Sequence, residues 1–192
     1  MKIGHAFPAY RHVIDSRAAD CREECALWAQ RAGHEWVRLP TQPTCTIEWN
    51  RNLIVASARL LEVDLLMMQD ADAWVPPISG PVLPMLMDSM ESTGAALVVP
   101  VFTARGKGRP MVFPLLHGQI FDAEVISGSM MLLDMRLLRN LPTPWFRFKF
   151  GEDGVKMLER EDLFFARLVR SAGHRVIADW TIPTCHLDEQ PF

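Results

Sequence analysis

The sequence has no long apolar run. No window of about 18 apolar residues occurs, because Glu62 and Asp64 interrupt the longest run and Asp70 and Asp72 end it. We therefore expect no transmembrane helix. The first eight residues are too short and too polar for a signal peptide, so we expect a soluble, cytoplasmic protein.

Cysteine is also scarce, with Cys21, Cys25, Cys45 and Cys185 as the four examples. Cys21 and Cys25 are four residues apart on the apolar side of an expected helix. A Cys-x3-Cys pair without a second pair is a weak metal signal. Disulfides are not expected in a cytosolic protein, so we expect buried free thiols.

Lysine is rare as well: the 20 basic residues comprise four lysines and 16 arginines, and the net charge is −3. This balance excludes a global basic field for nucleic acid or an anionic membrane. The planar fork of arginine suits phosphate, which favours a phosphate-bearing ligand. GC-rich coding explains the same excess of arginine equally well.

Apolar periodicity predicts strands that alternate with helices. Strands are expected at 2–7, 35–39, 63–69, 95–102, 125–133 and 175–180, and helices at 16–32, 47–61, 79–92, 135–140 and 161–172. Two short segments, 111–113 and 118–121, are expected to form a hairpin-like excursion, and 141–154 a functional loop. The alternation indicates a mostly parallel sheet with crossover helices, and the absence of linkers and repeats indicates one α/β domain over residues 1–192.

The strongest local motif is Asp70-Ala71-Asp72, directly after the apolar run 63–69. Ligands of open α/β sheets bind beyond the carboxyl ends of the strands. Two carboxylates at i and i+2 on extended chain point to one side and repel each other unless a cation or proton intervenes. The motif therefore predicts a divalent metal site, although Asp-x-Asp alone also occurs in solvated turns.

Three weaker features accompany it. Gly128, beside Ser129, predicts a close approach of the backbone to a ligand, or simply a strand bulge. Glu161 and Asp162 begin a helix, where they either cap it or supply a general base. His186 follows the last strand and is either a metal ligand or a surface residue.

Together these pieces resemble the GT-A nucleotide-sugar glycosyltransferases, in particular small family-2-like enzymes, over nearly the whole chain. Each piece is unspecific, and it is their order that is specific. The matching pieces are Arg51-Asn52 before the Asp-x-Asp motif, Gly128 to Leu138, Pro144-Trp145-Phe146, Glu161-Asp162, Arg167 with Gly173-His174-Arg175-Val176, and a closing His186.

The resemblance implies a single-domain GT-A (Rossmann-like) fold, with a nucleotide-binding part at about 1–103 and an acceptor and catalytic part at about 104–192. It implies transfer of a hexosyl or pentosyl group from a nucleotide-diphosphate donor to an acceptor hydroxyl, with inversion. The implied cofactor is Mn²⁺, or Mg²⁺, which would stabilise the leaving diphosphate as a Lewis acid.

The resemblance also implies roles for individual residues. Asp72 would bind the metal directly, Asp70 would hold the ribose or a metal-bound water, and His186 would be the third protein ligand. Asp162 would deprotonate the acceptor with Glu161 beside it. The nucleotide pocket would include Pro8, Ala9, Tyr10, Arg51, Asp70 and Ala71, and the sugar and acceptor pocket Gly128, Ser129, Trp145, Phe146 and Glu161.

Two features leave the substrates open. Many family-2 enzymes carry a base-binding Asp after strand two, where this chain has Leu39-Pro40-Thr41. The loop from Arg105 to Arg109 holds three cations and two glycines, which suits a phosphate-bearing acceptor, modified nucleic acid included, or a solvated loop. The sequence therefore leaves the acceptor open, with a saccharide and a modified nucleic acid as the two candidates considered.

Two other functions compete with glycosyl transfer. A sugar-nucleotide nucleotidyltransferase also uses an α/β sheet and a carboxylate-bound metal, but usually has a Gly-rich phosphate loop with a lysine near the first strand. His5 to Tyr10 contains no such loop. A non-catalytic nucleotide- or carbohydrate-binding module is the other alternative, and the complete set of Asp70, Asp72, Asp162 and His186 argues against it.

Overall fold

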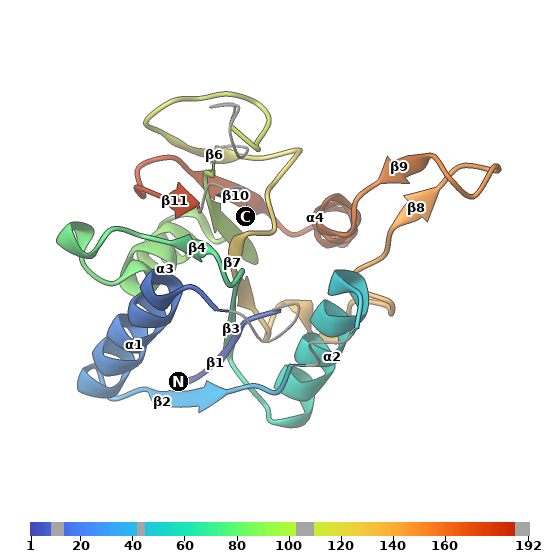
Figure 1. Ribbon diagram of the computed structural model, residues 1–192. Coiled ribbons are helices and arrows are strands. Elements are labelled where there is room, and N and C mark those ends of the chain that lie inside the picture. Colours follow the sequence, from blue (N-terminus) through green and yellow to red (C-terminus); the bar gives the residue numbers. More distant parts are fainter. Residues whose placement is uncertain (9–13, 42–44, 103–109, 187–192) are drawn as a thin grey trace.

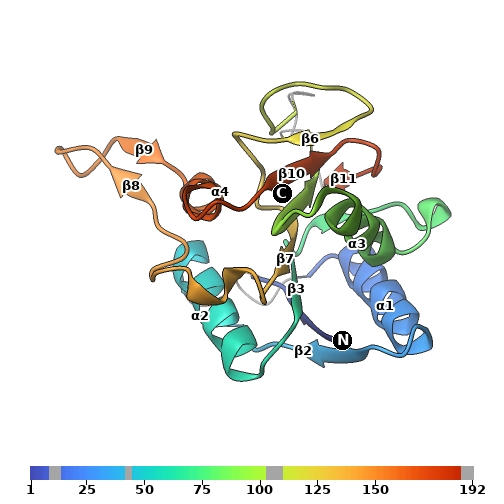
Figure 2. The same cartoon turned by 180° about the vertical axis from the view of Figure 1, so that it is seen from behind.

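The computed structural model describes residues 1–8, 14–41, 45–102 and 110–186, which form a central sheet between two layers of helices (Figure 1). The helices are α1 (Ser16–Arg31), α2 (Ile47–Leu60), α3 (Val82–Thr93) and α4 (Glu161–Ser171), with 3-10 turns at Pro77–Ser79 and Leu138–Asn140. Helices α1 and α3 cover one face of the sheet, and α2 and α4 lie on the other (Figures 1 and 2).

Seven strands form the central sheet in the order β2-β1-β3-β7-β5-β10-β6. They are β1 (Lys2–Ala6), β2 (Glu35–Arg38), β3 (Leu65–Gln69), β5 (Leu97–Pro100), β6 (Ile120–Asp122), β7 (Met130–Asp134) and β10 (Val176–Asp179). Strands β7 and β6 run against the other five, so the predicted mostly parallel α/β sheet is confirmed.

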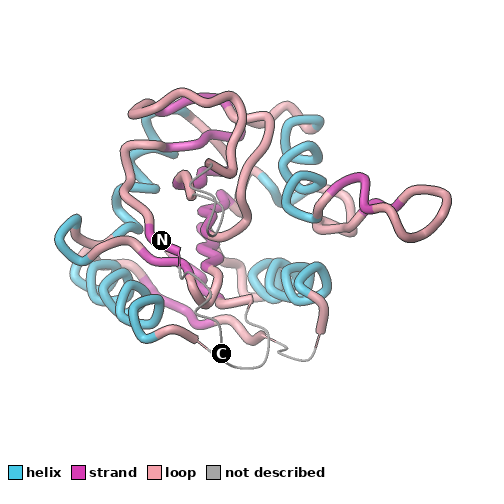
Figure 3. The backbone as a smooth tube through the Cα atoms, turned by 45° about the horizontal axis from the view of Figure 1, so that its top comes forward, coloured by secondary structure: helices cyan, strands magenta, loops and turns pink. Residues whose placement is uncertain are grey.

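Two small ribbons lie outside this sheet. Strand β4 (Ala73–Trp74) pairs with β11 (Cys185–His186), and β8 (Lys149–Phe150) pairs with β9 (Met157–Glu159). The β8–β9 hairpin projects from the body of the molecule in all three backbone views (Figures 1 to 3).

The core is divided by the sheet. All five residues of β3 and all five of β7 are buried, as an apolar strand covered on both faces requires. One apolar cluster joins the sheet to α1 and α3 and contains the free thiols of Cys21 and Cys25, which are buried as expected. The other joins the sheet to α2 and α4, with Phe146 and Phe165 stacked at 4.4 Å between ring centroids.

Four expectations about local structure are wrong. Segments 111–113 and 118–121 do not pair with each other, because β6 joins β10 and Phe113 bridges Val125. The strand expected at 125–133 begins only at Met130. The helix expected at 135–140 is a 3-10 turn, and the loop expected at 141–154 contains β8. The pairing of β6 with β10 joins segments more than fifty residues apart, so a local pattern does not reveal it.

No helix in the described part of the chain is both long enough and apolar enough to cross a membrane.

Candidate active site

The Asp70-Ala71-Asp72 turn lies where β3 ends, between the sheet and the β4–β11 ribbon. Asp70 N donates to Ser129 O on β7's side at 2.7 Å, and Ala73 N donates back to Asp70 O at 3.1 Å. Ala71 O accepts from Asp15 N at 2.8 Å, which ties the turn to the start of α1. The turn is thus fixed to three elements, while the Asp70 side chain stays 27% exposed and Asp72 is half-buried.

Gln69, the last residue of β3, holds the Asp70-Ala71-Asp72 turn in place through hydrogen bonds of its side chain. Its Nε2 donates to Ala18 O at 3.1 Å and to Ala73 O at 2.7 Å. The amide orientation leaves Oε1 to accept from His5 Nε2, 3.3 Å away, so the imidazole is the neutral Nε2–H tautomer. Burial lowers the pKa of His5 to about 3, which agrees with a neutral ring.

Arg51, on α2, connects the Asp-x-Asp turn to the head of α4. Its guanidinium is buried, and Nη1 donates to Glu161 Oε1 at 2.7 Å. Nη2 donates to Asp70 Oδ1 at 3.1 Å and to Gly128 O at 2.7 Å. The sequence predicts that Arg51 faces a nucleotide, whereas its terminal nitrogens contact acceptors of the protein itself.

Gly128 is close to that guanidinium. A Cβ at position 128 would collide with Arg51 Nη1 and lie 2.8 Å from Nη2. The sequence predicts a close approach to a ligand at this glycine, whereas the group that approaches it in the structure is the Arg51 side chain. Ser129, the next residue, is buried with its hydroxyl 2.9 Å from that of Ser127.

Glu161 and Asp162 begin α4 and are both buried. Burial raises the pKa of Glu161, and the charge of Arg51 opposes that rise. Asp162 Oδ2 accepts from Gly128 N at 3.0 Å and lies 3.1 Å from Arg160 Nη2, while Oδ1 accepts from Leu163 N at 2.9 Å. The carboxylate expected to act as a base is fully covered, and of these three donors only the half-exposed Arg160 side chain is free to swing away.

Asn52 holds the next segment of the site. Its Oδ1 accepts from Trp145 N at 2.9 Å and Phe146 N at 3.1 Å, and its Nδ2 donates to Phe146 O at 2.7 Å. The Trp145 ring is buried under Arg59, and its Nε1 donates to Leu141 O. Trp145 and Phe146 therefore pack in the core and do not present the aromatic face that the sequence predicts for a sugar.

The structure describes only some of the residues that were predicted to bind the nucleotide, the metal or the acceptor. Pro8 is buried at the end of β1, and Ala9 and Tyr10 lie outside the described residues, as does the Arg105–Arg109 loop. The backbone of His186 pairs with Ala73, next to Asp72. Among described side chains, no group of three His, Cys, Asp or Glu lies close enough to hold a metal ion.

Gln69 and Arg160 contact the candidate site but are not among the residues predicted for it. A polar amide at the end of an apolar strand, directly before two carboxylates, is a usable signal for Gln69. An arginine adjoining Glu161-Asp162 is a weak signal, since many arginines in this chain are exposed.

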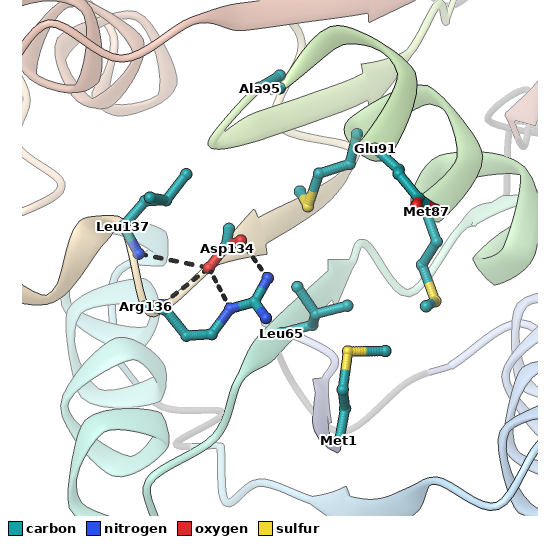
Figure 4. A pocket seen from close by; sticks show the side chains of 10 residues that line it. Met1, Leu65, Met87, Glu91, Ala95, Asp134, Arg136 and Leu137 are labelled. Atoms are coloured by element: carbon teal, nitrogen blue, oxygen red, sulfur yellow. Dashed lines mark hydrogen bonds and ion pairs between the residues drawn. The ribbon is translucent and has the colours of Figure 1, made fainter.

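A separate cavity of about 450 Å³ lies at the other edge of the sheet, near the start of β3 and the end of β7 (Figure 4). Met1, Leu65 and Met87 are among its lining residues. The carboxylate of Asp134 at its margin is occupied by Arg136 and by Leu137 N. None of the residues described for the cavity belongs to the predicted site.

The amino-acid sequence matches no protein-family model and no curated protein. Solved structures do resemble the fold. "A197 from STIV" matches with a TM-score of 0.66, at 12% identity over 98% of this chain and 87% of that one.

Two further structural neighbours are enzymes of named activity. A glycosyltransferase involved in glycosylation of the major capsid of PBCV-1 has a TM-score of 0.51, at 11% identity over 99% of this chain and 93% of that one. A UDP-glucose pyrophosphorylase has a TM-score of 0.52, at 12% identity over 98% of this chain and 93% of that one. At such identities the likeness concerns the fold: the chain has a GT-A-like α/β fold, shared with a solved glycosyltransferase and a solved UDP-glucose pyrophosphorylase.

Proposed function

We propose that the protein transfers a sugar from a nucleotide-diphosphate donor to an acceptor hydroxyl, with inversion. One observation carries the proposal. The buried guanidinium of Arg51 contacts Asp70 and Glu161, which belong to motifs far apart in sequence. The predicted donor-binding turn and the predicted catalytic helix head therefore lie at one edge of the sheet, where open α/β folds bind their ligands.

The donor end of the site is the Asp70-Ala71-Asp72 turn. We expect Asp72 to bind Mn²⁺ or Mg²⁺, Asp70 to hold the ribose or a metal-bound water, and His186 to approach along β11. Two hard carboxylates suit such an ion, which takes its remaining ligands from phosphate and water. When bound, the ion supplies Lewis-acid stabilisation of the departing diphosphate.

The acceptor end is the head of α4. Asp162 is the proposed base, and it becomes accessible to an acceptor hydroxyl when the Arg160 side chain moves off Oδ2. The Gly128 and Leu163 amides keep the carboxylate oriented during that movement. Arg51 and Glu161 act as positioning residues, because their charges are used within the protein.

A nucleotidyltransferase that makes nucleotide sugars is the second candidate, favoured by the likeness in fold to UDP-glucose pyrophosphorylase. Such enzymes usually have a Gly-rich phosphate loop near the first strand, and residues 5–10 of this chain contain no such loop. Release of pyrophosphate from a nucleoside triphosphate and a sugar phosphate would favour this second function over glycosyl transfer.

The test uses a panel of nucleotide diphosphates and nucleotide sugars, with and without Mn²⁺. Binding is followed by thermal unfolding and donor hydrolysis by mass spectrometry. We expect Asp72→Ala to abolish metal-dependent binding and Asp162→Asn to keep binding while it stops transfer. Asp88→Ala, an exposed aspartate on α3, is the matched control.

Two results would contradict the proposal. If no donor is bound or hydrolysed with metal present, the protein is a binding module or acts on other ligands. If Asp162→Asn retains near-full transfer, another group is the base.

A further inference from the structure

The β8–β9 hairpin projects from the body of the molecule and carries several exposed apolar side chains. We call residues 149–159 the arm. It extends outward from the head of α4, away from the central sheet, in Figures 1 and 2 and in the tilted view of Figure 3. Two-stranded hairpins are marginally stable alone in water, so an arm of this kind needs anchoring.

Hydrogen bonds within the arm close the turn at its tip, and contacts with α4 anchor its base. At its tip, Asp153 Oδ1 accepts from Val155 N and Lys156 N, both at 3.0 Å, and Gly151 N donates to Lys156 O. At its base, Glu159 pairs with Arg167 of α4 through two contacts of 2.9 Å. The arm therefore has a defined conformation before any partner arrives.

Both faces of the arm are apolar and open. Met157 and Leu158 are consecutive residues of β9, so their side chains point to opposite faces, and they are 50% and 53% exposed. Phe150, which pairs with Met157, is 49% exposed, and Val155 at the tip is 81% exposed. Clustered exposed apolar side chains on a projecting hairpin mark a binding surface.

The arm also continues directly from the candidate active site at both of its ends. It begins three residues after Phe146, which Asn52 holds and over whose ring Arg51 lies at 5.7 Å. It ends at Glu159, and Arg160 and Asp162 follow. A molecule docked along the base of the arm therefore lies next to the head of α4, which carries the group proposed to deprotonate the acceptor.

The charged residues of the arm indicate which class of molecule it binds. Glu152 and Asp153 are exposed at the tip, between Phe150 and Val155, and backbone donors lower the pKa of Asp153, so its carboxylate stays charged. Insertion of the tip into a membrane would bury these carboxylates in the lipid interface, which is unfavourable. Lys149 and Lys156 stand near them, and such mixed charge suits a polypeptide better than a surface of one sign.

We propose that the arm docks a polypeptide, and that the acceptor hydroxyl is carried by that polypeptide. The inference rests on the proposed glycosyl transfer and names its acceptor class. Open strand edges bind an extended peptide through backbone hydrogen bonds, and the apolar side chains on either face add contact area.

The test selects binding peptides from a random displayed library against the wild-type protein and compares three proteins. The arm variant carries Phe150→Ser, Met157→Ser and Leu158→Ser. The matched control carries Leu27→Ser, Leu60→Ser and Leu115→Ser, which remove exposed leucines from elsewhere. We expect the selected peptides to bind the arm variant at least about tenfold more weakly than the wild type and the control.

The same three proteins are tested for the thermal shift produced by UDP with Mn²⁺, and the peptides are offered as acceptors. We expect equal thermal shifts and loss of peptide glycosylation in the arm variant alone. If no protein responds to any nucleotide while the peptides still bind the arm, the proposed function fails and the acceptor assignment fails with it.

Four other results would overturn the inference itself while nucleotide binding persists. The library yields no binder, or the selected peptides bind the arm variant as tightly as the wild type. The wild-type protein binds phosphatidylcholine and phosphatidylserine vesicles in an arm-dependent manner, which makes the partner a membrane. Finally, sedimentation reveals self-association that the arm variant abolishes, which makes the partner a second copy.

Discussion

The role that the sequence predicts for Arg51 differs from the contacts that this residue makes in the structure. Its sequence position predicts a cation that faces the nucleotide, because an Arg-Asn pair precedes the Asp-x-Asp motif in the resembling enzymes. Glu161 is 110 residues away in sequence and contacts Nη1. No local pattern can reveal such a contact, so the sequence predicts a role for Arg51 but does not predict its partners within the protein.

Arg51→Lys tests that role. Lysine keeps the charge but lacks the fork that reaches Glu161, Asp70 and Gly128 together. We expect the free energy of unfolding of the ligand-free protein to fall by about 2–4 kcal/mol, since a buried charge pair is left poorly satisfied. Urea unfolding measures this change, with Arg59→Lys at an exposed position as the control.

A direct nucleotide contact makes a different prediction for the same variant. If Arg51 bound the diphosphate, the substitution would weaken nucleotide affinity and leave the ligand-free stability nearly unchanged. Calorimetric titration of UDP with Mn²⁺ into the wild-type protein and into Arg51→Lys distinguishes the two roles.

At the scale of elements, the four α-helices of the described chain were predictable and several strand pairings were not. Helix α1 begins and ends as expected because its signals are local: Asp15 accepts from Arg17 N at its start, and Gly33 follows its end with φ at 75°. The β4–β11 ribbon joins residues more than a hundred positions apart. Its short strands leave no hydrophobic period, so the sequence predicts a ligand histidine there but no strand.

Asn52 is the link between two such elements, α2 and the segment that leads to the arm. Asn52→Ala removes the partners of Trp145 N, Phe146 N and Phe146 O. We expect a loss of about 2–3 kcal/mol, because backbone groups that are partly buried lose their hydrogen bonds. Hydrogen exchange should accelerate at Trp145 and Phe146 before it does in α2.

The control for this prediction is Asn140→Ala, an exposed asparagine at the end of a 3-10 turn. Unchanged exchange at Trp145 in Asn52→Ala would mean that core packing of the ring, rather than the Asn52 amide, holds the segment.

At the scale of the whole molecule, His5 links the stability of the fold to pH. The ring is buried beside Trp36, with 5.4 Å between ring centroids, and its pKa is lowered from 6.5 to about 3. Between these values the unfolded chain binds a proton at His5 that the folded chain excludes. Stability therefore rises with pH through this window and falls as the pH drops below 6.5.

The lost stability can be estimated and measured. From pH 7 to pH 5, His5 should lower the free energy of unfolding by about 2 kcal/mol, because each pKa unit corresponds to about 1.4 kcal/mol. His5→Gln keeps an N–H donor for Gln69 but does not titrate. In urea unfolding, its free energy of unfolding should therefore fall by about 2 kcal/mol less than that of the wild type between pH 7 and pH 5. His117→Gln, at an exposed histidine, should retain the wild-type dependence. An equal fall in His5→Gln would show that protonation of other groups destabilises the fold and that His5 does not set its acid sensitivity.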